Sequence, residues 1–101
     1  MLFVTLYKAR PDLTREERQE IFTRRLQWNF DPSTKLVAEY FLVGANPDDP
    51  TGVLIYELDN PAALYRDDTT WSDLLDIRTH PAIPAEEGLK VIRQLAEAAA
   101  Q

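Results

Sequence analysis

Two adjacent acids, Asp67 and Asp68, stand in a stretch that otherwise predicts an amphipathic helix. Leu64, Trp71 and Leu75 recur at the spacing of one helical stripe, and Asp68 occupies a position in that stripe where an apolar residue is expected. A carboxylate buried without a partner is costly, so it finds a partner, shifts its pKa or opens onto water. One interpretation is therefore a polar pocket between this helix and a sheet, with Asp68 as an acid–base group and Asp67 beside it.

The alternative interpretation is that the helix breaks at these acids. Asn60 is a favourable N-cap and Pro61 suits the first helical position, so the helix is predicted over residues 60–75. Asp and Thr are poor in helix interiors and common as caps, so Asp68 or Thr69 could instead cap a short turn. The burial of Asp68 distinguishes the two interpretations.

Residues outside this stretch offer further chemistry. His80, the only histidine, is a candidate second acid–base group, and strand alternation places it on the same face as Arg78. Arg78 could bind a carboxylate or an enolate. For both residues the alternatives are structural, namely an exposed histidine at a strand end and an ion pair in a dimer interface.

Aromatic residues are candidates for the walls of a pocket. Trp71 could stack on a flat ligand, although its helical spacing also suits core packing. Tyr40 and Tyr56 fall in neighbouring predicted strands and could line the same cavity. We expect neither a metal site nor a cofactor, because cysteine is absent, histidine is single, and no phosphate-binding loop or nucleophile elbow occurs.

Composition excludes several classes of protein. The 101 residues are 45% apolar, which suits one domain with a modest core. A net charge of −6 argues against a surface for nucleic acid or anionic membrane. The chain shows neither a basic leader nor a long apolar run, so we expect no signal peptide or membrane span and a cytoplasmic location.

The order of predicted elements indicates an α+β, ferredoxin-like fold over residues 1–101. A capping box at Thr14 and Glu17 opens a helix to about Leu26, with Phe22 and Leu26 on its apolar face and Arg24 and Arg25 in solvent. The predicted strands cover residues 2–7, 35–43, 53–58 and 76–82, and a last helix begins at residue 84. The β-α-β-β-α-β order gives a four-stranded antiparallel sheet with a C-terminal helix added.

A sheet has two faces, and two helices cover only one of them. The second predicted strand is apolar on both faces, so a monomer would expose Val37 and Phe41 or their neighbours. Pairing the open faces of two copies removes this exposure. We therefore predict a homodimer with twofold symmetry.

The stretches 59–65 (DNPAALY) and 71–76 (WSDLLD), followed by Pro81, Glu86 and Glu87, resemble a family of short domains of unknown function. That family is grouped with the dimeric α/β-barrel superfamily, which includes cofactor-independent monooxygenases, polyketide cyclases, muconolactone-isomerase-like and haem-degrading enzymes, and stress-response proteins. The resemblance implies a dimeric barrel with a pocket between sheet and helices. It does not imply one activity.

The chain also departs from that family. Members carry a histidine in the second strand, where this sequence reads Glu39-Tyr40-Phe41, and an acid where it has Arg78. Glu39 and Arg78 are therefore predicted to form a charge-reversed pair across the barrel interior. Our functional hypothesis is a dimer that binds, and transforms without cofactor, a small organic molecule. The alternatives are a non-catalytic ligand-binding or regulatory dimer and a stress-related accessory protein.

Overall fold

The computed structural model describes residues 1–44 and 46–100. Its elements follow the order β1 (Leu2–Ala9), α1 (Arg15–Gln27), β2 (Lys35–Phe41), β3 (Gly52–Glu57), α2 (Pro61–Trp71), β4 (Leu75–Ala82) and α3 (Ala85–Ala99). The strands form one sheet in the order β2-β3-β1-β4, and every neighbouring pair is antiparallel. The predicted α+β, ferredoxin-like fold with an added C-terminal helix is confirmed.

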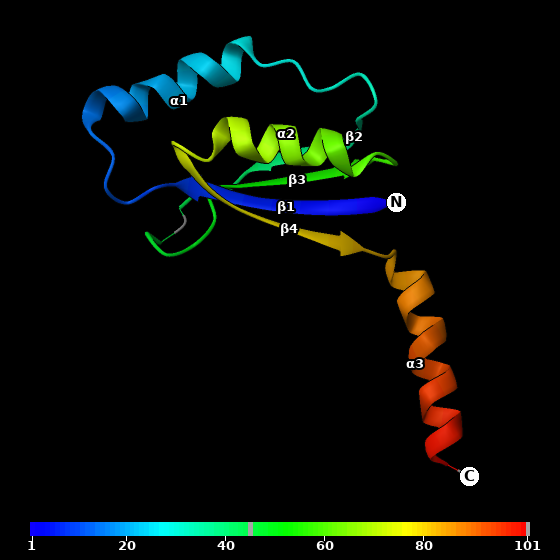
Figure 1. Cartoon of the computed structure of the whole chain (residues 1–101). Helices are drawn as coiled ribbons and strands as arrows, with labels where there is room; N and C mark the ends of the chain where they lie inside the picture. Colours follow the sequence, from blue (N-terminus) through cyan, green and yellow to red (C-terminus); the bar gives the residue numbers. More distant parts are fainter. Residues whose placement is uncertain (45, 101) are drawn as a thin grey trace.

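Both α1 and α2 lie on the same side of the sheet (Figure 1). The best-buried apolar side chains belong to this covered side or to the turn after α2, and none is more than 7% exposed: Tyr56, Leu58, Ala63, Trp71 and Leu74. The opposite side, which we call the open face, carries Val4 across from Ile55 and His80, and Leu6 across from Val53 and Arg78. No helix of the described chain lies flat on it.

A β-bulge at Val37 changes which residues of β2 face the helices. Leu36 is opposite Tyr56, but the next paired residue is Ala38, opposite Ile55, so Val37 is extra. Every later residue of β2 is therefore shifted to the other face, and Tyr40 lies on the open face across from Val53. Tyr40 is 60% exposed, whereas Tyr56 is 4% exposed on the covered side. The prediction that both tyrosines line one cavity is wrong for this reason.

Helix α2 runs unbroken through its two acids. Asn60 caps it by accepting a hydrogen bond from the N–H of Ala62 at 3.0 Å, and Pro61 takes the first helical position. The Thr70 hydroxyl bonds back to the Arg66 carbonyl at 2.8 Å, so the Asp-Asp-Thr-Thr run is helical and the predicted break is wrong. The helix ends at Trp71 rather than at the predicted residue 75, because the chain then turns directly into β4.

Helix α1 has the predicted capping box at Thr14 and Glu17. Its predicted apolar face is wrong, since Phe22 and Leu26 are 69% and 87% exposed. Arginine side chains hold this helix in place instead, as described below.

Helix α3 projects from the end of β4, away from the body of the molecule (Figure 1). The molecule consequently measures 60 Å along its longest axis against 33 and 19 Å along the others. Across residues 1–44 and 46–100, no helix combines the length and the apolar character needed to cross a bilayer.

Gly52 in β3 leaves no room for a side chain. A Cβ added there would overlap the Tyr7 ring, whose hydroxyl donates to Glu39 at 2.8 Å. We expect Gly52→Ala to lower the free energy of unfolding by roughly 1–3 kcal/mol, because Tyr7 must move and that bond must break. Gly88→Ala is the control, since the nearest atom there is 3.7 Å away. Urea unfolding measures both; equal stabilities of the two variants would contradict the prediction.

Candidate functional site

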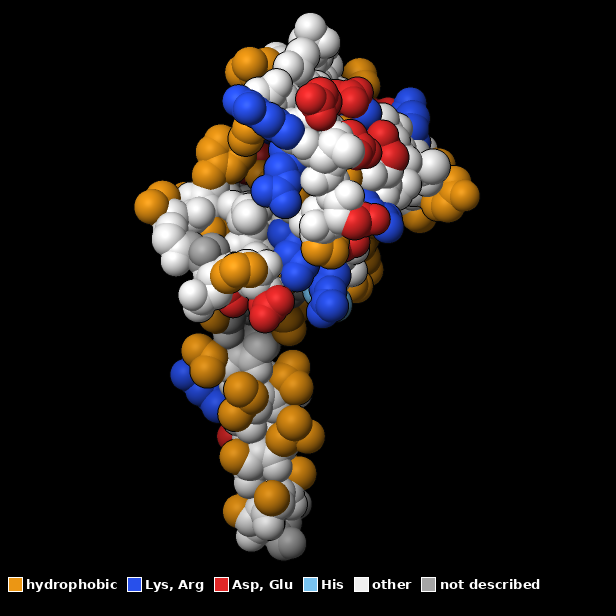
Figure 2. All heavy atoms as spheres, turned by 90° about the vertical axis from the view of Figure 1, so that its left-hand side faces the viewer, with side chains coloured by type: hydrophobic (Ala, Val, Ile, Leu, Met, Phe, Trp, Pro, Cys, Tyr) orange, Lys and Arg blue, Asp and Glu red, His pale blue; other side chains and the backbone are white. Residues whose placement is uncertain are grey.

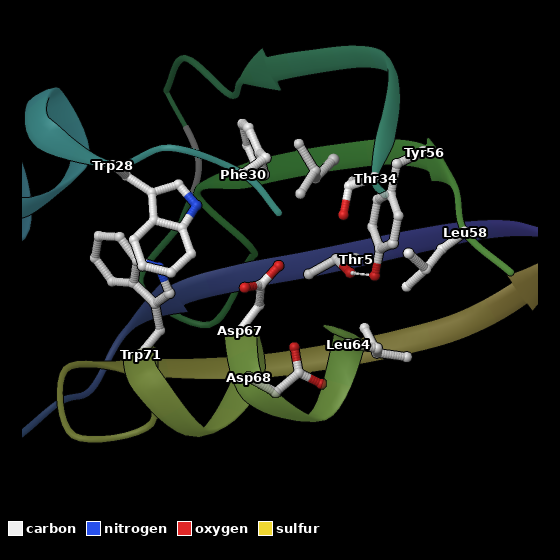
Figure 3. A pocket seen from close by; sticks show the side chains of 11 residues that line it. Thr5, Trp28, Phe30, Thr34, Tyr56, Leu58, Leu64, Asp67, Asp68 and Trp71 are labelled. Atoms are coloured by element: carbon white, nitrogen blue, oxygen red, sulfur yellow. Dashed lines mark hydrogen bonds between the residues drawn. The ribbon is translucent and has the colours of Figure 1, made fainter. Parts of the chain in front are cut away.

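A cavity of about 60 Å³ lies between the sheet and α2 (Figure 3). Its floor on the sheet is formed by Thr5, Leu54 and Tyr56. The Thr5 hydroxyl lies 2.8 Å from the Tyr56 hydroxyl and 2.9 Å from that of Thr79, so the floor contains a short chain of hydroxyl groups. Thr5 is 6% exposed, and burial of the Tyr56 hydroxyl raises its pKa. Tyr56 therefore keeps its proton at neutral pH.

Helix α2 supplies the acidic wall. Leu64, Asp67, Asp68 and Trp71 line the cavity, and Figure 3 shows the Asp67 carboxylate directed between Trp28 and Thr5. Asp67 and Asp68 are both half-buried, and neither forms a hydrogen bond or an ion pair with a described residue. The four residues that α2 contributes to the cavity thus include two carboxylates that form no hydrogen bond or ion pair with a described residue.

Desolvation is the main influence on both acids. Burial raises the pKa of Asp67, although Arg66 next to it opposes the rise. Burial also raises the pKa of Asp68, and the charge of Asp67 raises it further. Two like charges on adjacent, half-buried residues favour taking up a proton or binding a positive group.

The third wall is the connection between α1 and β2. Trp28, Phe30 and Thr34 line the cavity from this side. The Trp28 ring meets Trp71 edge to face, with centroids 5.6 Å apart. Asp31 pairs with Arg66 of α2, which fixes the connection to the helix opposite.

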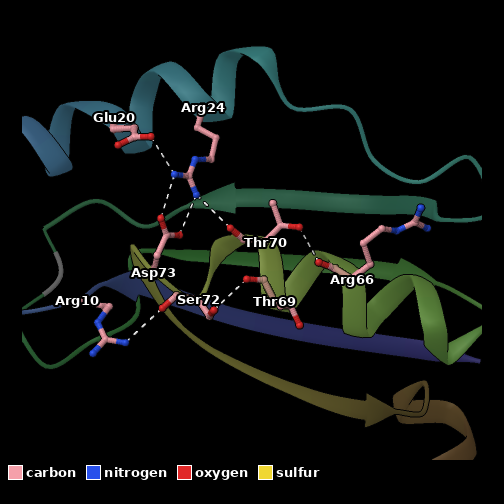
Figure 4. Close-up of polar contacts among 8 residues, drawn as sticks. All are labelled: Arg10, Glu20, Arg24, Arg66, Thr69, Thr70, Ser72 and Asp73. Atoms are coloured by element: carbon pink, nitrogen blue, oxygen red, sulfur yellow. Dashed lines mark hydrogen bonds and ion pairs between the residues drawn. The ribbon is translucent and has the colours of Figure 1, made fainter.

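Arg24 fastens α1 to the end of α2 (Figure 4). Its guanidinium donates to both carboxylate oxygens of Asp73, at 2.9 and 3.1 Å, to Glu20 at 2.9 Å and to the Thr70 carbonyl at 3.1 Å. It also lies 5.4 Å from the centroid of the Trp71 ring. The hydrogen bonds from Arg24 lower the pKa of Asp73, which is the opposite of what happens at Asp68.

Glu39 lies on the covered side but is not in the cavity. It accepts hydrogen bonds from Arg25 and, at 2.8 Å, from the Tyr7 hydroxyl. Arg78 lies on the open face opposite Leu6. The predicted Glu39–Arg78 pair is therefore wrong: the bulge places Glu39 on the helix side, and the sheet separates it from Arg78.

The structure gathers four of the eight predicted site residues around the cavity: Tyr56, Asp67, Asp68 and Trp71. His80 and Arg78 of β4 and Tyr40 of β2 all lie on the open face, at opposite edges of the sheet, so Asp68 and His80 do not share a site within one chain. The prediction that His80 and Arg78 lie on the same face of their strand, made from strand alternation, is confirmed.

Sequence reasoning missed Thr5, Trp28, Phe30 and Thr34. A tryptophan and a phenylalanine two residues apart in a predicted connection were a usable signal, because large aromatics in a short loop must be covered by something. Nothing in the sequence marked Thr5 or Thr34. The Thr34 hydroxyl oxygen is buried and has no hydrogen-bond partner among the described residues.

The arrangement can do two kinds of chemistry. A protonated Asp68 can donate a proton to a bound molecule, and an ionised one can accept a proton or hold a cation. The aromatic rings can bind an apolar or cationic surface. Arginine and lysine are absent from the cavity lining in the described residues, so the site has no group that would neutralise an anion.

Comparison with known proteins identifies a family and no function. A family model described as a domain of unknown function (DUF3303) matches residues 1–96. No curated protein and no solved structure matches the chain.

Replacing Asp68 by asparagine is expected to raise the free energy of unfolding at pH 7 by roughly 0.5–2 kcal/mol, since functional residues are often held at a cost in stability. The pKa of Asp68 is higher in the folded chain than in the unfolded chain, where it is about 3.9. The gain in stability should therefore be absent at a pH well below the pKa of the unfolded chain. It should grow as the pH rises from that value to the pKa of the folded chain, and stay constant at higher pH.

Asp73→Asn is the matched control, and its effect should have the opposite sign. Arg24 lowers the pKa of Asp73, so this variant should lose up to about 1 kcal/mol at pH 7. The loss should vanish as the pH falls through the lowered pKa. Thermal unfolding between pH 3 and 8 measures both variants. A loss of stability for Asp68→Asn at pH 7 would show that its carboxylate is well paired, against the assignment of the site.

Proposed function

The chain belongs to the family described as a domain of unknown function (DUF3303), and from its own site we propose that it binds a small organic molecule in the cavity under α2. The observation that carries the proposal is the pair of half-buried acids, Asp67 and Asp68, which line an aromatic cavity and form no hydrogen bond or ion pair with a described residue. Proteins rarely keep such groups in an apolar wall, because desolvating them costs stability. The unpartnered hydroxyl of Thr34 supports the proposal, since buried polar groups are usually hydrogen-bonded.

The charge and the size of the cavity restrict the class of ligand that it can bind. An anion would meet two carboxylates and no cation, so the ligand is neutral or positively charged. Trp28, Phe30 and Trp71 offer aromatic rings of the kind that bind alkylammonium groups. A cavity of about 60 Å³ admits a group of only a few non-hydrogen atoms, so any larger ligand must extend out of it.

We further propose that Asp68 acts as the acid–base group if the ligand is transformed, with no cofactor. Its raised pKa brings the two protonation states closer to balance at neutral pH. The Tyr56 hydroxyl, which keeps its proton, is a hydrogen-bond donor in the floor of the same cavity. The alternative function is a non-catalytic, regulatory or stress-related dimer in which the same pocket only binds.

The proposed assembly is a homodimer through the open face, as in the dimeric α/β-barrel superfamily. The support is the apolar row of Val4, Leu6, Val53 and Ile55, which lies on this face with exposed Tyr40 beside it. A contiguous apolar surface of this kind marks an interaction site. In this dimer Arg78 and His80 lie at the interface, on the far side of the sheet from the pocket.

The ligand proposal is testable with the two tryptophans of the chain, because Trp28 and Trp71 both line the cavity. We expect tetramethylammonium to change their fluorescence with a dissociation constant on the order of 1 mM, a realistic value for so few atoms. Neutral tert-butanol should bind more weakly, and trimethylacetate should not bind. Asp68→Asn should weaken binding of the cation about tenfold, or 1.4 kcal/mol.

The control for this titration is Asp76→Asn, which removes an exposed acid at the start of β4, on the same face as Arg78, and should leave binding unchanged. Preferential binding of trimethylacetate would refute the charge argument. If none of the three compounds alters the tryptophan emission, the pocket is not a binding site for small molecules.

The dimer proposal predicts a concentration-dependent mass by sedimentation equilibrium. Tyr40→Glu puts a charge into the apolar face and should raise the dimer dissociation constant at least tenfold, since a charge in an interface is costly. Tyr65→Glu is the matched control, because Tyr65 is also an exposed tyrosine (75%, against 60% for Tyr40) and lies on α2, away from the open face. A wild-type chain that remains monomeric at 0.1 mM would contradict the dimer.

A further inference from the structure

Helix α3 has a wide apolar side that nothing in its own chain covers. Its large aliphatic residues, with Ile83 just before it, are between 48% and 65% exposed: Ile83, Leu89, Val91, Ile92 and Leu95. At 100° per residue, the aliphatic residues within the helix and its alanines occupy one side, whereas the polar side holds Glu86, Glu87, Lys90, Arg93, Gln94 and Glu97. A helix with this pattern is built to lie on an apolar surface.

The helix also lacks the support that an isolated helix needs. Pro84 at its N-cap position makes no side-chain hydrogen bond. Beyond its first turn, no hydrogen bond or ion pair joins α3 to the rest of the described chain. Isolated helices of about 12–15 residues are marginal in water, so α3, with 15 residues, needs a packing surface to stay folded.

The position of α3 indicates where that surface comes from. Figure 1 shows α1 and α2 on one side of the sheet and α3 running away on the other side, the side of the open face. Figure 2, seen from the left of Figure 1, shows hydrophobic side chains along the side of α3 that is turned toward the space under the sheet. A groove lined by Leu2, Ala82, Ile83 and Glu87 joins the sheet to the start of the helix.

We propose that α3 is an arm that packs against a second copy of this chain, seated in the corner between α3 and the open face. This inference rests on the proposed dimer and adds to it the element that secures the partner. By twofold symmetry each copy extends its arm past the other, so the apolar stripe of each arm is buried against the partner copy.

The areas support a partner that contacts both surfaces together. Burying an aliphatic side chain removes on the order of 100 Å² from water, so the partly exposed stripe of α3 offers roughly 300 Å². A standard interface needs about 800 Å² from each partner. The stripe alone falls short, and the open-face side chains Val4, Leu6, Val53 and Ile55 are themselves only partly exposed. A partner in the corner covers both surfaces at once.

Substitutions in the stripe test the arm. We expect the double variant Ile92→Glu, Leu95→Glu to raise the dimer dissociation constant at least tenfold in sedimentation equilibrium, because each copy would bury two charges. The matched control is Lys90→Gln, Gln94→Glu, which changes the net charge by the same −2 on the polar side of α3 and should leave the dimer intact. Unchanged tryptophan emission from Trp28 and Trp71 shows that the body of each variant is folded.

Hydrogen exchange gives a second readout on the unmodified chain. Amides of α3 should be protected at concentrations where the chain is dimeric and should lose protection on dilution, while those of β1 and β3 remain protected. If the amides of α3 are equally protected from exchange at all concentrations, the proposal that α3 packs on a second copy is refuted.

The outcomes separate the two proposals. If Tyr40→Glu dissociates the dimer and the stripe variant does not, the dimer through the open face stands and the arm is refuted. If the stripe variant dissociates it and Tyr40→Glu does not, the helices pair without the open face and the corner arrangement is refuted. A monomeric wild-type chain refutes both.

Discussion

A four-stranded sheet has two faces, and this chain lays helices on only one of them. That constraint separates the molecule into a covered side, which holds the acid cavity, and an open face, which holds Arg78 and His80. Residues that alternate along one strand are thereby assigned to different surroundings and different roles. In β2 this assignment depends on a single extra residue, Val37, which places Glu39 on the covered side and Tyr40 on the open face.

On the covered side, arginine pairing holds α1 where apolar packing is poor. Arg24 bonds to Asp73 and Arg25 to Glu39, while Phe22 and Leu26 of the same helix stay exposed. The guanidinium groups are therefore used at the edges of the cavity. The two acids in its wall receive no hydrogen bond from a guanidinium, so burial raises the pKa of Asp68, whereas the hydrogen bonds from Arg24 lower the pKa of Asp73.

The sequence was sufficient for the order of elements, because caps at Thr14 and Asn60 and the apolar runs between turns are local signals. It also identified Asp67, Asp68 and Trp71 as neighbours of one cavity, since helical spacing is a regular geometry. Alternation correctly placed His80 with Arg78 but could not tell which face they share. The bulge left no local pattern. Trp28 and Phe30 signalled that their connection is covered, but the packing of Trp28 on Trp71 depends on contacts between distant segments.

The same two-faced sheet limits how binding and assembly can influence each other. The pocket and the proposed partner lie on opposite sides, so a ligand under α2 touches no residue of the open face. The connection that remains is through the strands: Tyr56 in the floor bonds to Thr5, and Thr5 to Thr79, which stands between Arg78 and His80 in β4. A ligand that reorders these hydroxyl groups reaches the interface only by moving the backbone of a strand hydrogen-bonded on one side to β1. Such a shift costs ladder hydrogen bonds, whereas rotating a hydroxyl costs little, so the fold favours a pocket that fills independently of assembly.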